Sequence, residues 1–332
     1  SWVLPAAGVA LLGISSFLIA GVYPGLIQQF QVKPSESSKE APYIERNIEN
    51  TRAAYGLNKV EVKDYSATIN TSAGQLANDA ATISNIRLMD PNVLSATFRQ
   101  LQQIKPYYTF TGSLDIDRYT IDGKTHDMVV AVREIDIEGN PNRNWINDHL
   151  VYTHGFGFVG AYANTQDVDG KPIFAVGDIP PKGVLGDFQP RIYFGENNPE
   201  YSIIGGLKGS DPVELDYPDD ASPNGQKNYT YTGTGGVPIG SLFNKLLFAV
   251  RHGEQRIVLS NLINKDSKIL YNRNPRERVA KVAPWLTLDG DPYPAVIDGK
   301  VQWIIDGYTT TAGYPYAQKT TLSTATTDAL TN

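Results

Sequence analysis

Cysteine is absent from this sequence of 332 residues. Its absence excludes disulfide bonds, thiolate nucleophiles, zinc sites built on thiolate ligands and iron–sulfur clusters held by cysteine. The cellular compartment stays open, because a protein can be exported without forming disulfides.

Runs of positive charge are also absent. The chain has 29 Lys and Arg against 35 Asp and Glu, which gives a formal net charge of −6. A protein that binds nucleic acid normally presents a basic face to the phosphate backbone. We therefore expect no nucleic-acid partner.

Charge of either sign is missing from the first 32 residues, and Lys33 is the first charged position. The stretch from Trp2 to Val22 reads WVLPAAGVALLGISSFLIAGV. As a helix it would be about 30 Å long, the thickness of a bilayer core. We predict a transmembrane helix over residues 1–23, with Trp2 and Tyr23 at the two interfaces.

This helix makes the lipid bilayer the first expected partner. The large apolar side chains predicted to lie in the hydrocarbon are Leu11, Leu12, Phe17 and Leu18. Glycines and serines between them suit packing against other membrane helices. A signal peptide fits less well, since a basic n-region is missing and the apolar stretch is too long. A buried helix of a soluble protein is the remaining alternative. Because the chain begins abruptly at the edge of the span, we expect it to be a fragment of a longer protein.

Residues 24–38 are predicted to be a polar connector, followed by a helical subregion over residues 39–106. Ser37 and Glu40 have the spacing of a capping box, and Gly56 would end that helix. Asp90 and Pro91 would begin another helix, which Pro106 would stop. The predicted inward stripe of this second helix is Val93, Leu94, Phe98 and Leu101. A weaker helix is expected over Ala73–Asn85.

From Tyr107 onward the pattern changes to strands. Polar and apolar or β-branched residues alternate around Asp122-Gly123, which predicts a hairpin. The same turn chemistry returns in VDGKPIFAV (168–176) and in YPAVIDGKVQWIIDGYT (293–309), and RIYFGE, YSIIGG and NYTYTG are further candidate strands. The fold class predicted for residues 107–316 is α+β, with a mixed, largely antiparallel sheet.

Three helices are expected to interrupt this sheet. They cover Trp145–Tyr152, Ser241–His252 and a segment that begins at Asn274-Pro275 and ends by Pro284. In the second of them, the apolar residues Leu242, Phe243, Leu246, Leu247 and Val250 are expected to face inward, with Gly253 as the stop. Residues 317–332 have no apolar period, which predicts a flexible tail or a truncation.

His154 is the candidate catalytic residue. It lies in YTHGFGFVGAY, where a nearby carboxylate could make it a general base. Gly155, Gly157 and Gly160 match G-x-G-x-x-G, but the residues that follow do not form an amphipathic helix, so a tightly packed glycine turn is favoured over a nucleotide site. Structural hydrogen bonding is the alternative role for His154. The sequence has no G-x-S-x-G elbow to nominate a serine nucleophile.

Calcium is the one metal that the sequence suggests. Asp167 and Asp169 precede Gly170, and Asp289 and Asp291 flank Gly290. Oxygen-rich loops of this kind can bind calcium, although neither matches an EF-hand loop. A solvated acidic surface is the alternative, and no other cofactor is expected.

Several long segments resemble a known family. They include NWINDHLVYTHGFGFVGA, QPRIYFGE, GGVPIGSLFNKLLFAVR and LSNLINKDSKILYNRNPRERVAKVAPWLTLDGDPYPAVIDGKVQWIIDGYTT. These segments are similar to uncharacterised protein family (UPF) 0182, large polytopic membrane proteins of actinobacteria and some cyanobacteria. The resemblance implies that residues 1–23 are the last helix of an N-terminal membrane region and that residues 31–332 are extracytoplasmic, within the cell envelope. It supplies no catalytic residue.

These observations leave three functions open. The first is a membrane-anchored extracytoplasmic domain that binds a partner protein or an envelope component; the 19 tyrosines suit such a wet interface. The second is an envelope hydrolase or transferase that uses His154 with a carboxylate. The third is a lipid- or glycan-handling module of a transport system, which would contain an apolar tunnel or an aromatic groove.

Overall fold

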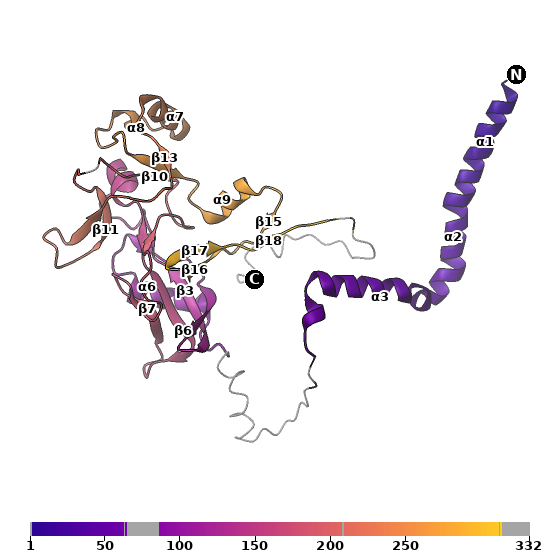
Figure 1. The fold of residues 1–332 in the computed structure, drawn as a ribbon, viewed down its shortest axis with the longest axis horizontal. Helices are drawn as coiled ribbons and strands as arrows, with labels where there is room; N and C mark the ends of the chain where they lie inside the picture. Colours follow the sequence, from indigo (N-terminus) through magenta and orange to yellow (C-terminus); the bar gives the residue numbers. More distant parts are fainter. Residues whose placement is uncertain (1, 63, 65–85, 208, 312, 314–332) are drawn as a thin grey trace. The chain divides into compact units, whose positions relative to one another are not determined.

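The computed structural model describes residues 2–62, 64, 86–207, 209–311 and 313. The predicted helix over Ala73–Asn85 and the tail 317–332 lie outside these residues. The chain divides into two compact units, a helical N-terminal unit and a β-rich unit that begins after residue 69. Figure 1 shows the helices and strands of each unit.

The N-terminal unit is helical from Val3 to Ala54. The helix starts as α1 (Val3–Phe17) and ends as α3 (Glu36–Ala54). Between them lie the π-helical segment Leu18–Val22, α2 (Tyr23–Ile27), a second π-helical segment Gln28–Val32 and a 3₁₀ turn Lys33–Ser35. The predicted connector 24–38 is therefore itself helical.

The capping box predicted at Ser37 was wrong. Ser37 lies inside the first turn of α3, whose N-cap is Ser35 without a side-chain capping bond. The Ser35 hydroxyl instead donates to the carbonyl of Gln31, 2.9 Å away. Since helical turns precede α3, upstream carbonyls are available to its first amides and a cap is not needed. The predicted end is confirmed, because Gly56 follows α3 in the left-handed conformation with φ of 68°.

A five-stranded antiparallel sheet forms the centre of the β-rich unit. Its strand order is β2-β3-β6-β7-β8. The strands are β2 (Asp115–Ile121), β3 (Lys124–Val132), β6 (Phe158–Gln166), β7 (Pro172–Gly177) and β8 (Lys182–Gly183). The predicted hairpin is confirmed: Asp122 and Gly123 join β2 to β3, both with positive φ as a type I′ turn requires.

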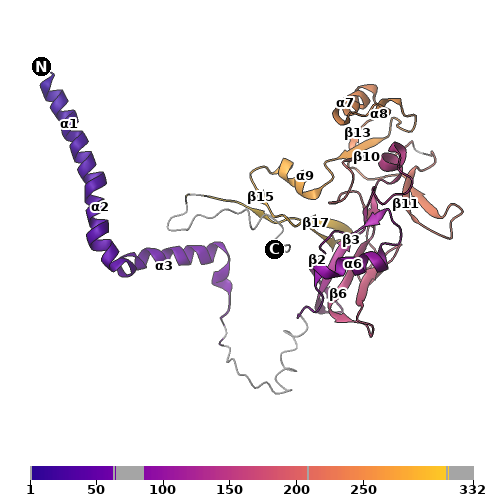
Figure 2. The same ribbon diagram turned by 180° about the vertical axis from the view of Figure 1, so that it is seen from behind.

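Helix α6 (Pro91–Gln102) covers one face of this sheet, as Figures 1 and 2 show from opposite sides. It starts where predicted, because the Asp90 side chain accepts from the amide of Asn92. Leu94 and Phe98 pack with apolar residues of β3 and β6. Val93 and Leu101, which the stripe predicted to be buried, are exposed.

A second hairpin covers the opposite face. It consists of β16 (Tyr293–Ile297) and β17 (Lys300–Ile304), joined by a turn at Asp298-Gly299 with positive φ. Val296, Val301 and Trp303 pack against the side chains that β3 turns to this face. The sheet therefore has a core on each side, as the alternation of side chains along a strand requires.

Five smaller strand groups complete the unit, and every one of their named pairs is antiparallel. The pairs are β1 (Tyr108–Thr109) with β4 (Glu134–Ile135), β5 (Gly155–Phe156) with β9 (Arg191–Ile192), β11 (Glu214–Pro218) with β12 (Gln226–Tyr229), and β15 (Thr287–Leu288) with β18 (Gly307–Tyr308). The remaining group is β10 (Tyr201–Ile204), β14 (Lys268–Tyr271) and β13 (Val237–Pro238). The α+β class with a largely antiparallel sheet is confirmed.

The predicted helices of the β-rich unit are present. Residues Asn147–Val151 form a single π-helical turn, and α7 (Leu242–His252) ends at Gly253 as predicted. The short helix α8 (Arg256–Leu259) follows, and α9 (Pro275–Val282) begins at Asn274, whose side chain accepts from the amide of Glu277. The inward orientation predicted for α7 was wrong: Leu242, Phe243, Leu246, Leu247 and Val250 are all exposed.

The opposite side of α7 packs on the unit. Ala249 is buried, and Phe248 packs against the core around β10 and β14. The Lys245 ammonium donates to the carbonyl of Ile263 at 2.8 Å, and the His252 ring lies 4.3 Å from that of Tyr201. Small, aromatic and hydrogen-bonded polar groups thus form the packed face, and the aliphatic stripe remains on the surface.

Candidate functional site

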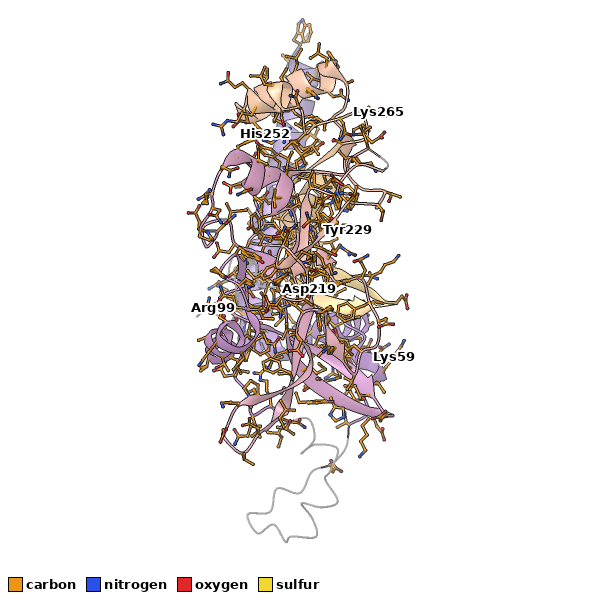
Figure 3. The ribbon with its side chains drawn as sticks, turned by 90° about the vertical axis from the view of Figure 1, so that its left-hand side faces the viewer. Lys59, Arg99, Asp219, Tyr229, His252 and Lys265 are labelled. Atoms are coloured by element: carbon orange, nitrogen blue, oxygen red, sulfur yellow. The ribbon has the colours of Figure 1, made fainter. Side chains whose placement is uncertain are left out.

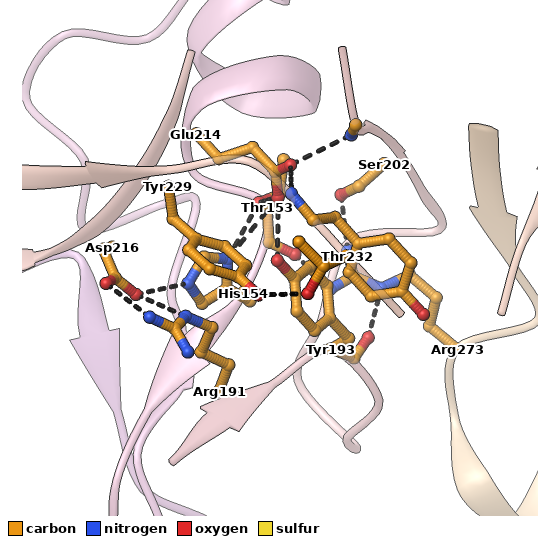
Figure 4. Close-up of polar contacts among 12 residues, drawn as sticks. Thr153, His154, Arg191, Tyr193, Ser202, Glu214, Asp216, Tyr229, Thr232 and Arg273 are labelled. Carbon is orange, nitrogen blue, oxygen red and sulfur yellow. Dashed lines mark hydrogen bonds and ion pairs between the residues drawn. The ribbon is translucent and has the colours of Figure 1, made fainter. Parts of the chain in front are cut away.

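His154 lies just before β5 and is fully buried. Its Nε2 is 3.4 Å from Asp216 Oδ1, and its Nδ1 is 3.0 Å from the hydroxyl oxygen of Thr153 (Figure 4). The Tyr193 ring packs against the imidazole with centroids 4.5 Å apart. A carboxylate is therefore within reach of His154, as general-base chemistry needs, but the ring is sealed from solvent.

Asp216 is held by Arg191 as well. Both guanidinium nitrogens Nε and Nη2 donate to the carboxylate at 2.7 Å, which is a bidentate pair. Burial alone would raise the pKa of Asp216, but hydrogen bonds from His154 and Arg191 outweigh it and hold that pKa below its usual value. The Tyr229 ring stacks on the Arg191 guanidinium at 3.6 Å. This ring covers part of the ion pair, in which the Arg191 side chain is 18% exposed and that of Asp216 7%.

Glu214, two residues earlier on β11, is the second buried carboxylate. It accepts from the hydroxyls of Thr153 and Tyr193 at 2.8 and 2.9 Å. The backbone amides of Gly205 and Tyr231 donate to its other oxygen at 3.0 and 2.9 Å. Four donors therefore satisfy both oxygens of this buried carboxylate.

Arg273 completes the network from the opposite side (Figure 4). Its guanidinium donates to the carbonyls of Thr153 and Tyr193 and to the hydroxyl of Ser202, at 2.6, 2.8 and 2.6 Å. Burial lowers its pKa to about 10, so Arg273 remains charged at neutral pH. We call these residues the His154 network: Thr153, His154, Arg191, Tyr193, Ser202, Glu214, Asp216, Tyr229 and Arg273.

The His154 network has little space for a substrate. Glu214 and Tyr229 line a neighbouring cavity of about 30 Å³, which has room for roughly one water molecule. A substrate could reach the imidazole only after Tyr193 or Tyr229 had moved. The geometry therefore favours a structural role, in which the network fixes the strands that supply its members.

The glycines after His154 serve packing. A Cβ on Gly155 would lie within 3 Å of the Arg133 backbone, and a Cβ on Gly160 would meet the Met128 side chain. Gly157 has φ of 96°, which favours glycine. Because these glycines lie in and between β5 and β6, without a helix after them, the context of a dinucleotide site is missing.

The four aspartates proposed for calcium make hydrogen bonds or ion pairs with other groups of the protein. Asp167 accepts from the amides of Asp169 and Lys171, and Asp169 pairs with the Lys171 ammonium at 3.4 Å. Asp289 accepts from the amide of Asp291 and from the Tyr308 hydroxyl. Across the described ranges, no group of three His, Asp or Glu side chains is placed to hold a metal ion.

The predicted membrane residues all point outward from the N-terminal helix. Trp2, Leu11, Leu12, Phe17, Leu18 and Tyr23 are all exposed in the absence of a bilayer. The helix is long and apolar enough to cross a membrane, and none of its most apolar window is buried in protein. These properties support membrane association through the N-terminal unit.

The β-rich unit carries an apolar surface. Its residues on α7 were predicted from helical periodicity to face the core. We define the α7–α8 surface as Leu242, Phe243, Leu246, Leu247 and Val250 of α7 with Leu259 of α8. At 100° per residue, the five positions of α7 fall within about 140° of the helix circumference, which makes one stripe. Val250 is 83% exposed and Leu259 72%. A contiguous apolar patch of this kind is typical of an interaction site.

An open groove of about 810 Å³ adjoins this surface. Its apolar lining comes from Trp145, Ile146, Leu259 and Leu262, and its polar lining from Asn144, Arg256, Ser260 and Asn261. The volume is in the range of small-molecule sites. Sequence periodicity revealed the stripe but not the groove, because residues 144–146 and 256–262 meet only in the fold.

Comparisons with known proteins agree with the resemblance seen in the sequence. The profile of "Uncharacterised protein family (UPF0182)" matches residues 1–332. A UPF0182 protein of Arthrobacter sp. is 53% identical over 99% of this chain, and those of Frankia alni and Streptomyces coelicolor are 52% and 48% identical over 99% and 100%.

The aligned part covers 33%, 32% and 32% of these three relatives, so the chain spans about a third of their length. No solved structure matches this chain. The family profile covers every residue of the chain, and the relatives share about half of its positions. The chain therefore belongs to the uncharacterised protein family UPF0182.

Proposed function

We propose that this chain is the membrane-anchored, extracytoplasmic part of a larger polytopic membrane protein and that its β-rich unit is a binding module. The N-terminal helix anchors the chain in the cell membrane, and the β-rich unit lies in the envelope, as the family resemblance implies. The module binds a component of the envelope at the α7–α8 surface.

One observation carries this proposal. A helix of the folded unit presents five large apolar side chains to solvent, three of them more than 60% exposed. Removing apolar surface from water is favourable by roughly 25 cal/mol per Å², so such a stripe is stabilised when a partner covers it. The two cores of the central sheet lie elsewhere in the unit, which leaves the stripe available.

Labelling of single cysteines tests the proposal, because the chain has no cysteine of its own. Val250→Cys places a thiol on the α7–α8 surface. Val168→Cys is the matched control in the turn between β6 and β7, where the native side chain is fully exposed. Intact cells that express the full-length protein, with any cysteine outside these 332 residues replaced by Ser, are treated with a membrane-impermeant maleimide. We expect Cys at position 168 to react and Cys at position 250 to be protected, with equal labelling after denaturation.

Two outcomes would contradict the proposal. Labelling of position 168 only after permeabilisation would place the β-rich unit on the cytoplasmic side. Equal labelling of both positions in intact cells would mean that nothing covers the α7–α8 surface.

A further inference from the structure

The charge around the α7–α8 surface differs in sign from that of the whole chain. Residues 241–268 contain five Lys and Arg against two acidic residues, in a chain of net charge −6. Arg251, Arg256 and Lys265 are exposed. Figure 3 labels His252, the last residue of α7, and Lys265 at the same end of the β-rich unit. The segment that carries the apolar stripe therefore has a formal net charge of +3, five basic residues minus two acidic ones.

Three acidic groups moderate this positive charge. Glu254 Oε1 is 3.7 Å from Arg256 Nε, and Glu200 lies 3.3 Å from His252 Nδ1. Asp266 is the other acidic residue of the segment, next to Lys265. Arg251 lies over the Tyr271 ring at 4.9 Å and has no carboxylate among its described contacts. The basic excess therefore remains after these contacts.

The composition of the stripe favours lipid over protein. Four Leu and Val side chains and one Phe form the stripe of α7, whereas protein interfaces are enriched in Tyr, Trp and Arg at their centres. An apolar helical face beside Lys and Arg is the pattern of helices that lie in the bilayer interface. A second copy of the chain is disfavoured, because a two-fold contact would bring like charges together.

The groove next to the surface fits the same ligand. Leu259, Leu262 and Ile146 offer an apolar wall, while Arg256 adds a guanidinium at its edge. Arginine matches the geometry of phosphate oxygens. A phospholipid has both features in one molecule, an acyl chain and an anionic phosphate.

We infer that the α7–α8 surface docks on the headgroup region of a bilayer that contains anionic phospholipid. The stripe of α7 enters the boundary between headgroups and acyl chains, and Arg251 and Arg256 contact phosphates. This inference rests on the proposed function, because it names the envelope component that the binding module takes. It gives the β-rich unit a second attachment to the membrane, independent of the N-terminal helix.

Depth-dependent quenching tests the inference on the full chain, reconstituted in lipid nanodiscs. Val250→Cys and the matched control Val168→Cys are labelled with an environment-sensitive dye. The discs contain phosphatidylcholine alone or with phosphatidylglycerol, each with or without brominated acyl chains. We expect blue-shifted, bromine-quenched emission at position 250 in the anionic discs, and neither effect at position 168.

Two further measurements separate charge from burial. The double variant Arg251→Gln/Arg256→Gln should lower the ratio of docked to free surface about thirty-fold, since each basic residue near an anionic surface contributes about 1 kcal/mol. High salt should act in the same direction. Circular dichroism of the variant checks that the fold is retained.

Three outcomes would overturn the inference. Equal quenching in neutral and anionic discs, with no effect of the double variant, would remove the role of anionic lipid. If position 250 is not quenched in any disc but is protected in cells, the partner is a protein and the proposed function stands. If position 250 is neither quenched nor protected, both the inference and the proposed function fail.

Discussion

Helices α6 and α7 both begin at a side-chain cap and both carry an apolar stripe, but they turn that stripe to different surroundings. Asp90 caps α6 and Ser241 caps α7. Phe98 of α6 is fully buried against the central sheet, whereas Phe243 of α7 is 69% exposed. Two helices with a similar apolar pattern thus differ in one respect: the central sheet covers the stripe of α6, whereas the stripe of α7 is exposed to solvent.

This difference shows what helical periodicity can and cannot predict. A period of 3.6 residues indicates that one face of a helix will be removed from water. It does not say whether the same unit, another protein or a membrane covers that face. Four predictions separate these contributions, from the largest expected effect to the smallest.

Replacement of the two phenylalanines should give the largest contrast. Phe98→Ala leaves a cavity between α6 and the sheet and should lower the free energy of unfolding by about 3–5 kcal/mol. Phe243→Ala removes a side chain that is 69% exposed and should change the free energy of unfolding by less than about 0.5 kcal/mol. Thermal unfolding of both variants measures the difference. A similar loss for the two would mean that the α7 stripe supports the fold.

A buried and an exposed ion pair should likewise differ in how much each contributes to the free energy of unfolding. Asp216→Asn weakens the buried pair with Arg191 and should cost about 2 kcal/mol at neutral pH. The matched variant Asp127→Asn weakens the exposed pair of Asp127 with Arg118, at 2.7 Å, and should cost less than about 1 kcal/mol.

The cost of Asp216→Asn should also depend on pH. Because the folded protein holds the pKa of Asp216 below its usual value, the contribution of Asp216 is complete above the unfolded pKa, about 3.9, and is lost as the pH falls through the folded pKa. Denaturant titrations at neutral pH and in acid should therefore show the gap between wild type and Asp216→Asn closing in acid. A gap that widened in acid would contradict the assigned sign.

The caps should have equal and small effects. Asp90→Ala and Ser241→Ala each remove one bond to a first-turn amide, at 3.0 and 3.2 Å, and each should cost about 1 kcal/mol. Each cap bonds an amide of its own helix, so its contribution to stability should not depend on whether the apolar stripe faces the core or solvent. Equilibrium unfolding of the two variants checks this. A much larger cost at Ser241 would show that α7 depends on its cap more than α6 does.

Local signals in the sequence predicted the elements well. The turns at Asp122-Gly123 and Asp298-Gly299 need positive φ, and the sequence supplies residues that tolerate it. The caps at Asp90 and Asn274 and the stop at Gly253 depend on neighbouring residues, so they too could be predicted. The capping box at Ser37 failed because the upstream helix continues, which the motif itself does not encode.

Contacts between distant residues could not be predicted in this way. His154 was identified as a candidate, but its partners Asp216 and Glu214 come from β11, about sixty residues later. No spacing rule links His154 to Arg273. The orientation of α7 depends on contacts of His252 with Tyr201 and of Lys245 with Ile263, 51 and 18 residues apart in sequence. Helical periodicity does not report such contacts, so the stripe was assigned to the wrong environment.

The buried guanidinium of Arg273 has a consequence for the order of folding during synthesis. It donates to Thr153 across 120 positions of the chain and to Tyr193 across 80. A nascent chain that ends before residue 273 has the carbonyls of Thr153 and Tyr193 in place but lacks the donor that satisfies them. Contacts of such large separation form late and slow the folding of a β-rich unit. The central sheet can therefore pair early, while closure of the interior waits until Arg273, two residues after the end of β14, has emerged from the ribosome.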